Sequence, residues 1–380
     1  MIRIVFVVPL MAPYAIPRYK ELAKDPEIEV HVVVENDTSS DRIGWKFQEI
    51  DGVRTHLLGK CISHNYKVYN REDNYQMNKR YTFSVDLRKC INNISPDVVI
   101  ACNSMQLLTL IGNRNYKLIA VVEDTLRAAE SRGWFKKKIK KLLLKQVDYY
   151  MPFTKDAESF LINYGINNHF INTTWSMDVE FFSDLSTKEK KEMKRKELGL
   201  ERDFVNFVIV ANLIPRKGIE EFLNGWRRMS EDFQKKSRLY ILGEGMLKDK
   251  LKKYTHENSL TNVYVMGNKN YQNVSWYLQC ADVFVLPTLE DLCSLAVLEA
   301  MAARCPILTT VYNGARQFVE ESVNGYIFDP LQEKSIIDVL EKISNADLNK
   351  MSKASGELIK NYSTEKVMHK MGDDIKKIFS

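Results

Sequence analysis

Two carboxylates, separated by seven residues, lie in a segment that joins a predicted strand to a predicted helix. Asp291 lies in the polar loop, and Glu299 lies about one turn into the helix that begins near Leu295. The apolar run 282–287 before the loop has the length of a strand and ends at a proline, and residues 295–303 have helical spacing. We therefore expect the chain to run here from strand to loop to helix.

This order of elements suits a bound anion. At the carboxyl edge of a parallel sheet, the first turn of a helix directs unpaired backbone N–H groups into the crevice, where a phosphate can accept their hydrogen bonds. Ser294 is the predicted N-cap of the helix. The alternative interpretation of the two acids is that Glu299 is a solvated helix residue and Asp291 a turn residue.

The segment that begins at Asp291 resembles the E-x7-E signature of the retaining family 4 glycosyltransferases, with Asp291 at the position of the first Glu. The resemblance implies that Asp291 contacts hydroxyls of a donor sugar and that Glu299 holds the ribose of its nucleotide. It also implies that backbone amides of the loop meet the diphosphate. These amides belong to Ser294, Leu295 and Ala296.

A second segment, 213–218, resembles the family's G-R-L-x-x-x-K-G motif, in which Arg and Lys grip the donor diphosphate. Lys217 and Gly218 match the motif, whereas Asn212 stands where the family has its Arg. One phosphate-binding cation is therefore absent unless the neighbouring Arg216 turns inward. The amide of Asn212 could still donate a hydrogen bond.

Two further glycine turns follow predicted strands in the same half of the chain. Gly243 opens a G-x-G turn, which by itself is a weak signal. The loop at Gly267 and Asn268 corresponds to the one that meets the nucleotide base in relatives. The resemblance covers about residues 200–330 with specific order and spacing, and residues 1–182 only loosely.

The first half departs from the family pattern at two places. Its first loop, 11–17, contains a Pro-Tyr-x-x-Pro segment in place of a glycine pair, and the acceptor group that this loop meets is left open. Glu123 stands where the family commonly has a His that touches the donor sugar. Either Glu123 accepts a hydrogen bond from a sugar hydroxyl or the position has lost its role.

Repeated strand and helix patterns predict an α/β protein. The resemblance implies the GT-B fold, in which two Rossmann-like domains with parallel sheets face each other across a cleft and the last helix crosses back to the first domain. We expect an acceptor-side domain, a charged linker, a nucleotide-sugar domain and a returning C-terminal helix. Their predicted bounds are 1–182, 183–203, 204–361 and 362–380.

A basic segment at 133–145 predicts an amphipathic helix in which lysines surround an apolar side. Such a helix can bind an anionic membrane surface. The lysines assigned to that surface are Lys136, Lys137, Lys140 and Lys141. The alternative is a solvated helix packed on the sheet.

Composition limits the other classes of protein. The chain has 380 residues, 45% hydrophobic and 27% charged, which is typical of a globular protein with about two domains. It has no apolar run of 18 residues and no signal-peptide pattern, so we expect a cytosolic protein, peripheral on the inner face of the membrane at most. Its net charge of +6 is concentrated in one helix without a recognised nucleic-acid module, so we expect no nucleic-acid partner.

The resemblance implies transfer of a sugar, with retention of configuration, from a nucleotide diphosphate to a glycan or polyprenyl-linked acceptor in surface polysaccharide or glycoconjugate synthesis. Because the chain has no D-x-D triplet, we expect no metal and no cofactor. We also expect the donor to be a UDP-sugar rather than a GDP-sugar. The predicted catalytic residues are Asp291, Glu299 and Lys217. The alternatives are an interaction protein that keeps the fold without catalysis, and a sugar-nucleotide epimerase or phosphorylase of the same fold.

Overall fold

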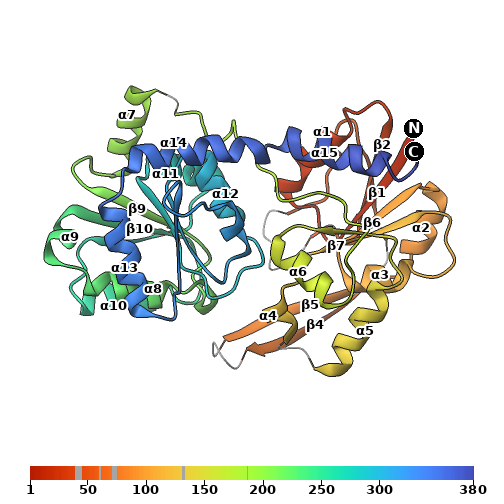
Figure 1. Ribbon diagram of the computed structural model, residues 1–380, viewed down its shortest axis with the longest axis horizontal. Coiled ribbons are helices and arrows are strands. Elements are labelled where there is room, and N and C mark those ends of the chain that lie inside the picture. The colour runs from red at the N-terminus through yellow and green to blue at the C-terminus, as the bar shows by residue number, and fades with distance from the viewer. Residues whose placement is uncertain (39–44, 60, 71–74, 131–132, 186) are drawn as a thin grey trace. The chain divides into compact units, whose positions relative to one another are not determined.

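A computed structural model describes residues 1–38, 45–59, 61–70, 75–130, 133–185 and 187–380 of the chain. It divides into two compact units (Figure 1). The first unit comprises Met1–Ser176 and Thr364–Ser380, and the second comprises Met177–Ser363. Both ends of the chain therefore belong to the first unit.

The first unit is built around a six-stranded sheet in the order β3-β2-β1-β6-β7-β8, in which every neighbouring pair is parallel. Its strands are β1 (Ile2–Val8), β2 (Ile28–Val34), β3 (Arg54–Leu57), β6 (Val98–Ala101), β7 (Lys117–Val122) and β8 (Tyr149–Pro152). An antiparallel pair, β4 (Cys61–Asn70) with β5 (Tyr75–Ser84), forms a separate hairpin.

Helices cover both faces of this sheet, which is why its central strands are nearly continuous apolar runs. The helices are η1 (Pro13–Ala15), α1 (Ile16–Leu22), α2 (Leu87–Ile94), α3 (Ser104–Leu110), α4 (Leu126–Glu130), α5 (Trp134–Leu144), α6 (Lys155–Asn163) and α15 (Thr364–Lys376). Alternate residues of β1 enter two different cores: Ile4 and Phe6 pack on one face, and Val5 and Val7 on the other.

The second unit repeats the plan with a parallel sheet in the order β11-β10-β9-β12-β13-β14. Its strands are β9 (Val205–Val210), β10 (Ser237–Leu242), β11 (Val263–Gly267), β12 (Val283–Leu286), β13 (Ile307–Thr310) and β14 (Gly325–Phe328). The helices are α7 (Lys188–Leu198), η2 (Pro215–Lys217), α8 (Ile219–Arg228), α9 (Glu231–Lys236), α10 (Lys248–Glu257), α11 (Tyr271–Cys280), α12 (Leu295–Ala302), η3 (Gly314–Phe318), α13 (Glu333–Ser344), α14 (Leu348–Ile359) and η4 (Lys360–Tyr362). The prediction of two Rossmann-like α/β domains with parallel sheets is therefore confirmed.

The segment predicted as a linker, 183–203, instead belongs to the second unit. Its charged helix α7 packs against α11, and the guanidinium of Arg195 donates at 2.6 Å to both carboxylate oxygens of Asp282. The charge run is therefore only partly a solvated face. The chain passes between the units at Ser176/Met177 and at Ser363/Thr364.

The last helix, α15, contributes to the core of the first unit. Val367, Met368 and Met371 are buried there, and α15 packs against α1. The ammonium of Lys376 adds an ion pair with Asp25 at 2.8 Å. The amphipathic spacing of this helix is thus satisfied by a sheet face formed at the other end of the sequence.

Candidate functional site

The strand order of the second unit reverses between β9 and β12, and doubly wound sheets bind ligands in the crevice at such a switch point. The loop after β9 contains Lys217 and Gly218, and the loop after β12 contains Asp291 and Ser294. The two loops lie side by side because β9 and β12 are hydrogen-bonded neighbours. The two predicted phosphate-binding segments therefore meet at one sheet edge.

Lys217 and Asp291 form an ion pair at this edge. The Lys217 ammonium donates to Asp291 Oδ2 at 2.5 Å, and their side chains are only 10% and 14% exposed. An ammonium has three N–H donors, so this bond fixes its position and leaves donors for another acceptor. The pair places one oriented cation beside the start of α12.

Two opposing effects act on the pKa of Lys217. Desolvation lowers the pKa of Lys217, and the neighbouring carboxylate of Asp291 opposes that shift by favouring the charged form. An anion bound beside the ammonium would add to the effect of Asp291.

Gly218 permits the close approach of the two loops. Its φ is +63°, and a Cβ at this position would lie 2.0 Å from the backbone oxygen of Pro287. Thr288, which is fully buried, donates from its hydroxyl to the backbone oxygen of Arg216 at 3.0 Å. Only glycine fits here, and the buried threonine ties the loops together.

Arg216 lies along the same loop pair. One of its terminal nitrogens donates to the backbone oxygen of Glu290 at 2.8 Å, and its buried Nε has no hydrogen-bond partner within the described residues. Its guanidinium thus follows the loop that carries Asp291 and keeps an unused donor.

The start of α12 is organised differently from the prediction. Ser294 occupies the N-cap position, but its side chain makes no capping hydrogen bond, so the expected cap is wrong in its chemistry. Buried Asn313 takes over instead, because its Oδ1 accepts from the amides of Ser294 at 3.3 Å and Ala315 at 3.0 Å. In the described part of the chain, the amides of Leu295 and Ala296 have no hydrogen-bond acceptor. They are therefore available to an anion.

Glu299 is half-buried on α12 and accepts a hydrogen bond from the Tyr271 hydroxyl at 3.2 Å. Burial raises the pKa of Glu299 to about 7, and the hydrogen bond from Tyr271 partly opposes this. The ring of Tyr271 stacks on Phe181, with centroids 4.9 Å apart, and meets Phe182 edge-on. The carboxylate thus faces an aromatic group that the sequence did not assign to the site.

The remaining predicted donor ligands lie on loops of the same sheet edge. Gly243 needs its glycine because a Cβ would lie 1.8 Å from the backbone oxygen of Ala211, and its amide donates to the oxygen of Gly267 at 2.9 Å. Asn212 and Asn268 are exposed. None of these contacts tests a role in binding, so those roles stay predictions.

Glu123 and the basic helix belong to the first unit. Glu123 directly follows β7 and is half-buried. Lys140 does not project freely from α5, because its ammonium pairs with Asp124 at 3.0 Å and donates to the Ser104 hydroxyl at 3.1 Å. The assignment of Lys140 to a membrane surface is therefore wrong.

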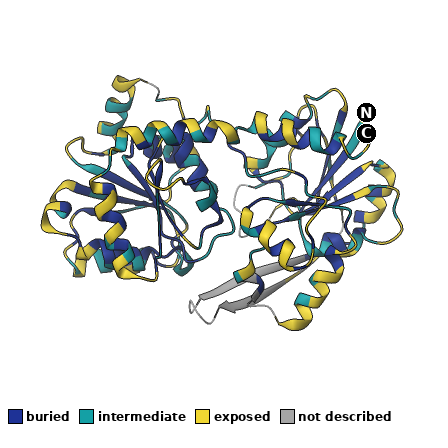
Figure 2. Ribbon diagram, in the orientation of Figure 1, coloured by how far each residue is buried: buried dark blue, intermediate teal, exposed yellow. Residues whose placement is uncertain are grey.

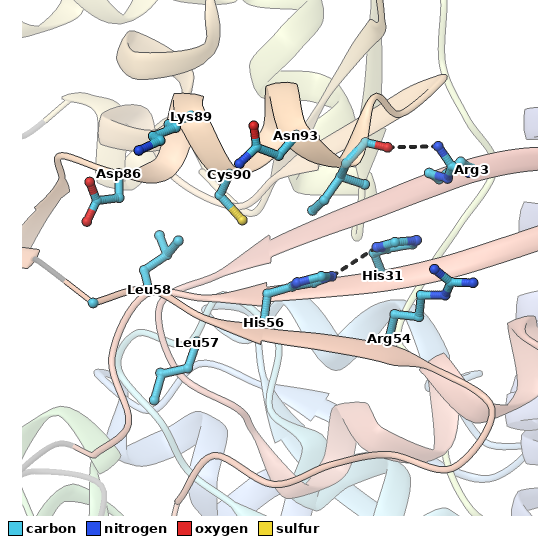
Figure 3. A pocket seen from close by; sticks show the side chains of 12 residues that line it. Arg3, His31, Arg54, His56, Leu57, Leu58, Asp86, Lys89, Cys90 and Asn93 are labelled. Atoms are coloured by element: carbon cyan, nitrogen blue, oxygen red, sulfur yellow. Dashed lines mark hydrogen bonds between the residues drawn. The ribbon is translucent and has the colours of Figure 1, made fainter.

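A pocket of about 680 Å³ opens on the first unit between β3 and α2 (Figure 3). His31 and His56 lie at its base with a 3.0 Å hydrogen bond between their rings. Arg3 and Arg54, which line it, both pair with Glu29, at 2.7 Å and 3.0 Å. The pocket contains none of the predicted site residues, and both of its arginines pair with the single carboxylate of Glu29.

Sequence reasoning missed the site roles of Tyr271 and Thr288 and the contacts that Asn313 makes. No local signal identifies the contacts of Tyr271 with Glu299, of Thr288 with Arg216, or of Asn313 with Ser294, because the two residues of each pair are 19 or more positions apart in the sequence.

Residues 190–361 match the family model of the glycosyl transferases group 1. The match lies within the second unit, Met177–Ser363. The matched residues include both loops of the site and all of α12.

Relatives of this chain include glycosyltransferases from several organisms. It is 24% identical over 250 residues to the uncharacterized glycosyltransferase MJ1069 of Methanocaldococcus jannaschii, covering 65% of this chain and 62% of the relative. It is 28% identical over 203 residues to the UDP-Gal:alpha-D-GlcNAc-diphosphoundecaprenol alpha-1,3-galactosyltransferase of Escherichia coli, covering 52% and 51%. It is 26% identical over 187 residues to the alpha-monoglucosyldiacylglycerol synthase of Acholeplasma laidlawii, covering 49% and 44%. The matches thus span between 44% and 62% of the length of these relatives.

Solved structures give the fold of the whole chain. The sucrose-phosphate synthase of Thermosynechococcus elongatus has a TM-score of 0.74 at 14% identity, covering 100% of this chain and 99% of that one. HepE of Anabaena, solved in complex with UDP and glucose, has a TM-score of 0.71 at 12% identity with the same coverage. The chain has the GT-B fold. Among the helices of the described residues, none combines the length and apolar character needed to span a bilayer.

Proposed function

We propose that this protein is a retaining family 4 glycosyltransferase that transfers a sugar from a nucleotide diphosphate to a glycan or polyprenyl-linked acceptor. The observation that carries the proposal is the meeting of the Lys217–Asp291 pair with the open amides of α12, at the switch point of the unit that matches the group 1 family model. A site of this kind binds the diphosphate of a donor and stabilises it as it leaves.

The chemistry assigned to each group follows from its environment. The Lys217 ammonium and the amides of Leu295 and Ala296 donate to diphosphate oxygens, and each hydrogen bond to the charged group contributes about 1.5–3 kcal/mol. Asp291 orients Lys217 and accepts from a sugar hydroxyl. Glu299 accepts from the ribose hydroxyls. The residues that are present provide positive charge for the leaving group without a metal ion.

The names of the relatives guide the choice of substrates. The Escherichia coli relative uses a UDP-sugar and a diphosphoundecaprenol-linked acceptor, and HepE was solved with UDP and glucose. We therefore propose UDP as the nucleotide and a lipid-linked or polysaccharide acceptor in envelope glycan assembly. These names favour the transferase hypothesis over the epimerase, phosphorylase and interaction-protein hypotheses.

Donor binding tests the proposal directly. Calorimetric titration of the full chain with UDP, UDP-glucose, UDP-galactose, UDP-N-acetylglucosamine and GDP should give saturable binding of the UDP compounds. Lys217→Ala should lose most of that affinity and Glu299→Ala should weaken it, while both variants keep the melting transition of a folded protein. Wild-type affinity in both variants would remove these residues from the site.

Product analysis separates the alternatives. With labelled donor, a transferase releases UDP and hydrolyses the donor slowly without acceptor, whereas an epimerase changes the sugar and retains the nucleotide. An interaction protein of this fold would neither bind nor turn over the donor. An α-linked product from an α-linked donor would support retention, and inversion would refute that part.

We further propose that α5 binds an anionic membrane surface. Trp134, Phe135, Ile139 and Leu142 are 76%, 60%, 41% and 56% exposed. The last three are spaced i, i+4 and i+7, so they form one stripe along α5, most of whose ribbon is coloured as exposed in Figure 2. Leu143 and Leu144 are buried and attach the helix to the unit. Exposed lysines flank the stripe: Lys136, Lys138, Lys141 and Lys145. An apolar stripe between cations suits a surface of anionic lipids.

Vesicle sedimentation tests this surface. The full chain should sediment with vesicles of phosphatidylglycerol and phosphatidylcholine and remain in the supernatant with phosphatidylcholine alone. Charge reversal at three lysines that flank the stripe should abolish sedimentation, whereas charge reversal at three lysines elsewhere should not. The test set is Lys138→Glu, Lys141→Glu and Lys145→Glu, and the matched set on α10 and α14 is Lys252→Glu, Lys350→Glu and Lys353→Glu. Equal sedimentation of both sets would discard the proposal.

A further inference from the structure

The first unit has a switch point of its own, between β1 and β6, where its strand order reverses. Arg18 lies on α1, the helix that follows β1, and Cys102 directly follows β6. Glu123 directly follows β7, and Phe153 directly follows β8. Four neighbouring strands therefore bring these side chains to one carboxyl edge, the place where such sheets bind ligands.

Arg18 is a cation held by aromatic rings. Its guanidinium carbon lies 4.9 Å from the ring centroid of Phe153 and 5.7 Å from that of Trp175. Among the described residues it has neither a hydrogen-bond acceptor nor an ion-pair partner. Its side chain is partly exposed, and burial lowers its pKa. The planar fork of N–H donors is therefore oriented by stacking and left without an anion.

Glu123 is an acid that interacts electrostatically with Arg18, but the two side chains form no ion pair. Burial raises the pKa of Glu123, the adjacent Asp124 raises it further, and Arg18 opposes both. Its carboxyl has no hydrogen-bond partner among the described residues and is partly exposed. An unmatched acid and an unmatched cation thus stand at the same edge.

Aromatic side chains line this edge next to Arg18. Tyr14, which precedes Arg18 by four residues, packs edge-on against Trp175 with ring centroids 5.9 Å apart. Trp175 in turn packs against Phe153 at 4.9 Å. The buried indole N–H of Trp175 has no acceptor within the described residues. Rings beside polar donors are suited to a sugar with a charged substituent.

We propose that Arg18 binds the anionic group of the acceptor, a phosphate or a carboxylate, and that Glu123 accepts from a hydroxyl of the same acceptor sugar. This inference rests on the proposed function, since it assigns the acceptor class of that reaction. The guanidinium fork matches both anions in geometry. A phosphate would come from a lipid-linked acceptor, and a carboxylate from a uronic acid in a glycan.

Calorimetry with three small probes distinguishes these sources. N-acetylglucosamine 1-phosphate carries the phosphate, glucuronate carries the carboxylate, and N-acetylglucosamine is neutral. The full chain should bind one charged probe at least about tenfold more tightly than the neutral sugar, as expected for a charge-assisted bidentate contact. The preferred probe identifies the source of the anion.

Variants assign the binding to Arg18. Arg18→Gln should remove the preference for the charged probe, and Arg18→Lys, which keeps the charge but not the fork, should retain part of it. Lys20→Gln, an exposed cation on the same helix, is the matched control and should bind as wild type. Arg18→Lys also serves as the test variant if Arg18→Gln melts at a lower temperature.

The test of the acceptor site at Arg18 can fail or succeed independently of the test of the donor site at Lys217. Lys217→Ala, in the second unit, should lose UDP binding and keep the charged probe. Loss of the probe in Lys217→Ala with wild-type binding in Arg18→Gln would place the probe in the donor site and overturn the inference. Equal affinity of all three probes for the wild-type chain would also overturn it. Absence of UDP binding would refute the proposed function instead.

Discussion

The raised pKa of Glu299 leads us to expect that donor affinity depends on pH near neutrality. Burial raises the pKa of this carboxyl to about 7 in the donor-free protein. In the proposed complex, ribose hydroxyls donate to the ionised carboxylate, so the charged form should bind the nucleotide better. The group gains its proton as the pH falls through 7, and affinity should therefore fall on the acid side.

The size of the effect follows from the ionised fraction. A carboxyl with a pKa of about 7 is ionised in roughly nine molecules in ten at pH 8 and roughly one in eleven at pH 6. If only the ionised form binds, the apparent Kd rises about tenfold between these values. UDP-glucose is the suitable titrant, because its diphosphate is esterified at both ends and does not change charge in this range.

Calorimetric titration of the full chain with UDP-glucose at pH 6, 7 and 8 measures this dependence. Glu299→Gln is the control, since it keeps the size of the side chain and cannot ionise. It should bind more weakly than the wild type at pH 8 and show a flat profile. A flat wild-type profile, or an equal slope in Glu299→Gln, would refute the reasoning.

Three further outcomes are expected. Tyr271→Phe removes the hydrogen bond that lowers the pKa of Glu299, so the midpoint of the pH profile should move upward, and an unchanged midpoint would contradict the contact. Gly218→Ala should destabilise the protein in urea unfolding by more than Gly199→Ala does, because both positions have a φ near +70° but only Gly218 lies against another loop. The strain shared by the two substitutions costs roughly 1–2 kcal/mol, and equal losses would mean that the loops move apart. Asn313→Ala should cost about 1–3 kcal/mol in the same measurement, since it leaves buried amides without an acceptor, and a neutral result would show that water replaces the side chain.

The sequence determined the local elements and their order. The apolar run 282–287 and the helical spacing of 295–303 predicted a strand and a helix, and the structure has β12 at Val283–Leu286 and α12 at Leu295–Ala302. The alternation of strands and helices predicted parallel sheets, because parallel neighbours need a crossover connection. Motif order placed Lys217 and Asp291 on loops at the end of strands.

Only the tertiary structure decided which of these groups meet. Lys217 and Asp291 are 74 residues apart, and they pair because β9 and β12 became neighbours in the sheet. The hydrogen bond between Tyr271 and Glu299 likewise joins residues that are distant in the sequence. Lys140 pairs with Asp124, so its ammonium is not on the membrane-facing surface that the sequence predicted for it. Local patterns fix periodicity, whereas partners across strands depend on sheet order and on the depth at which each charge is buried.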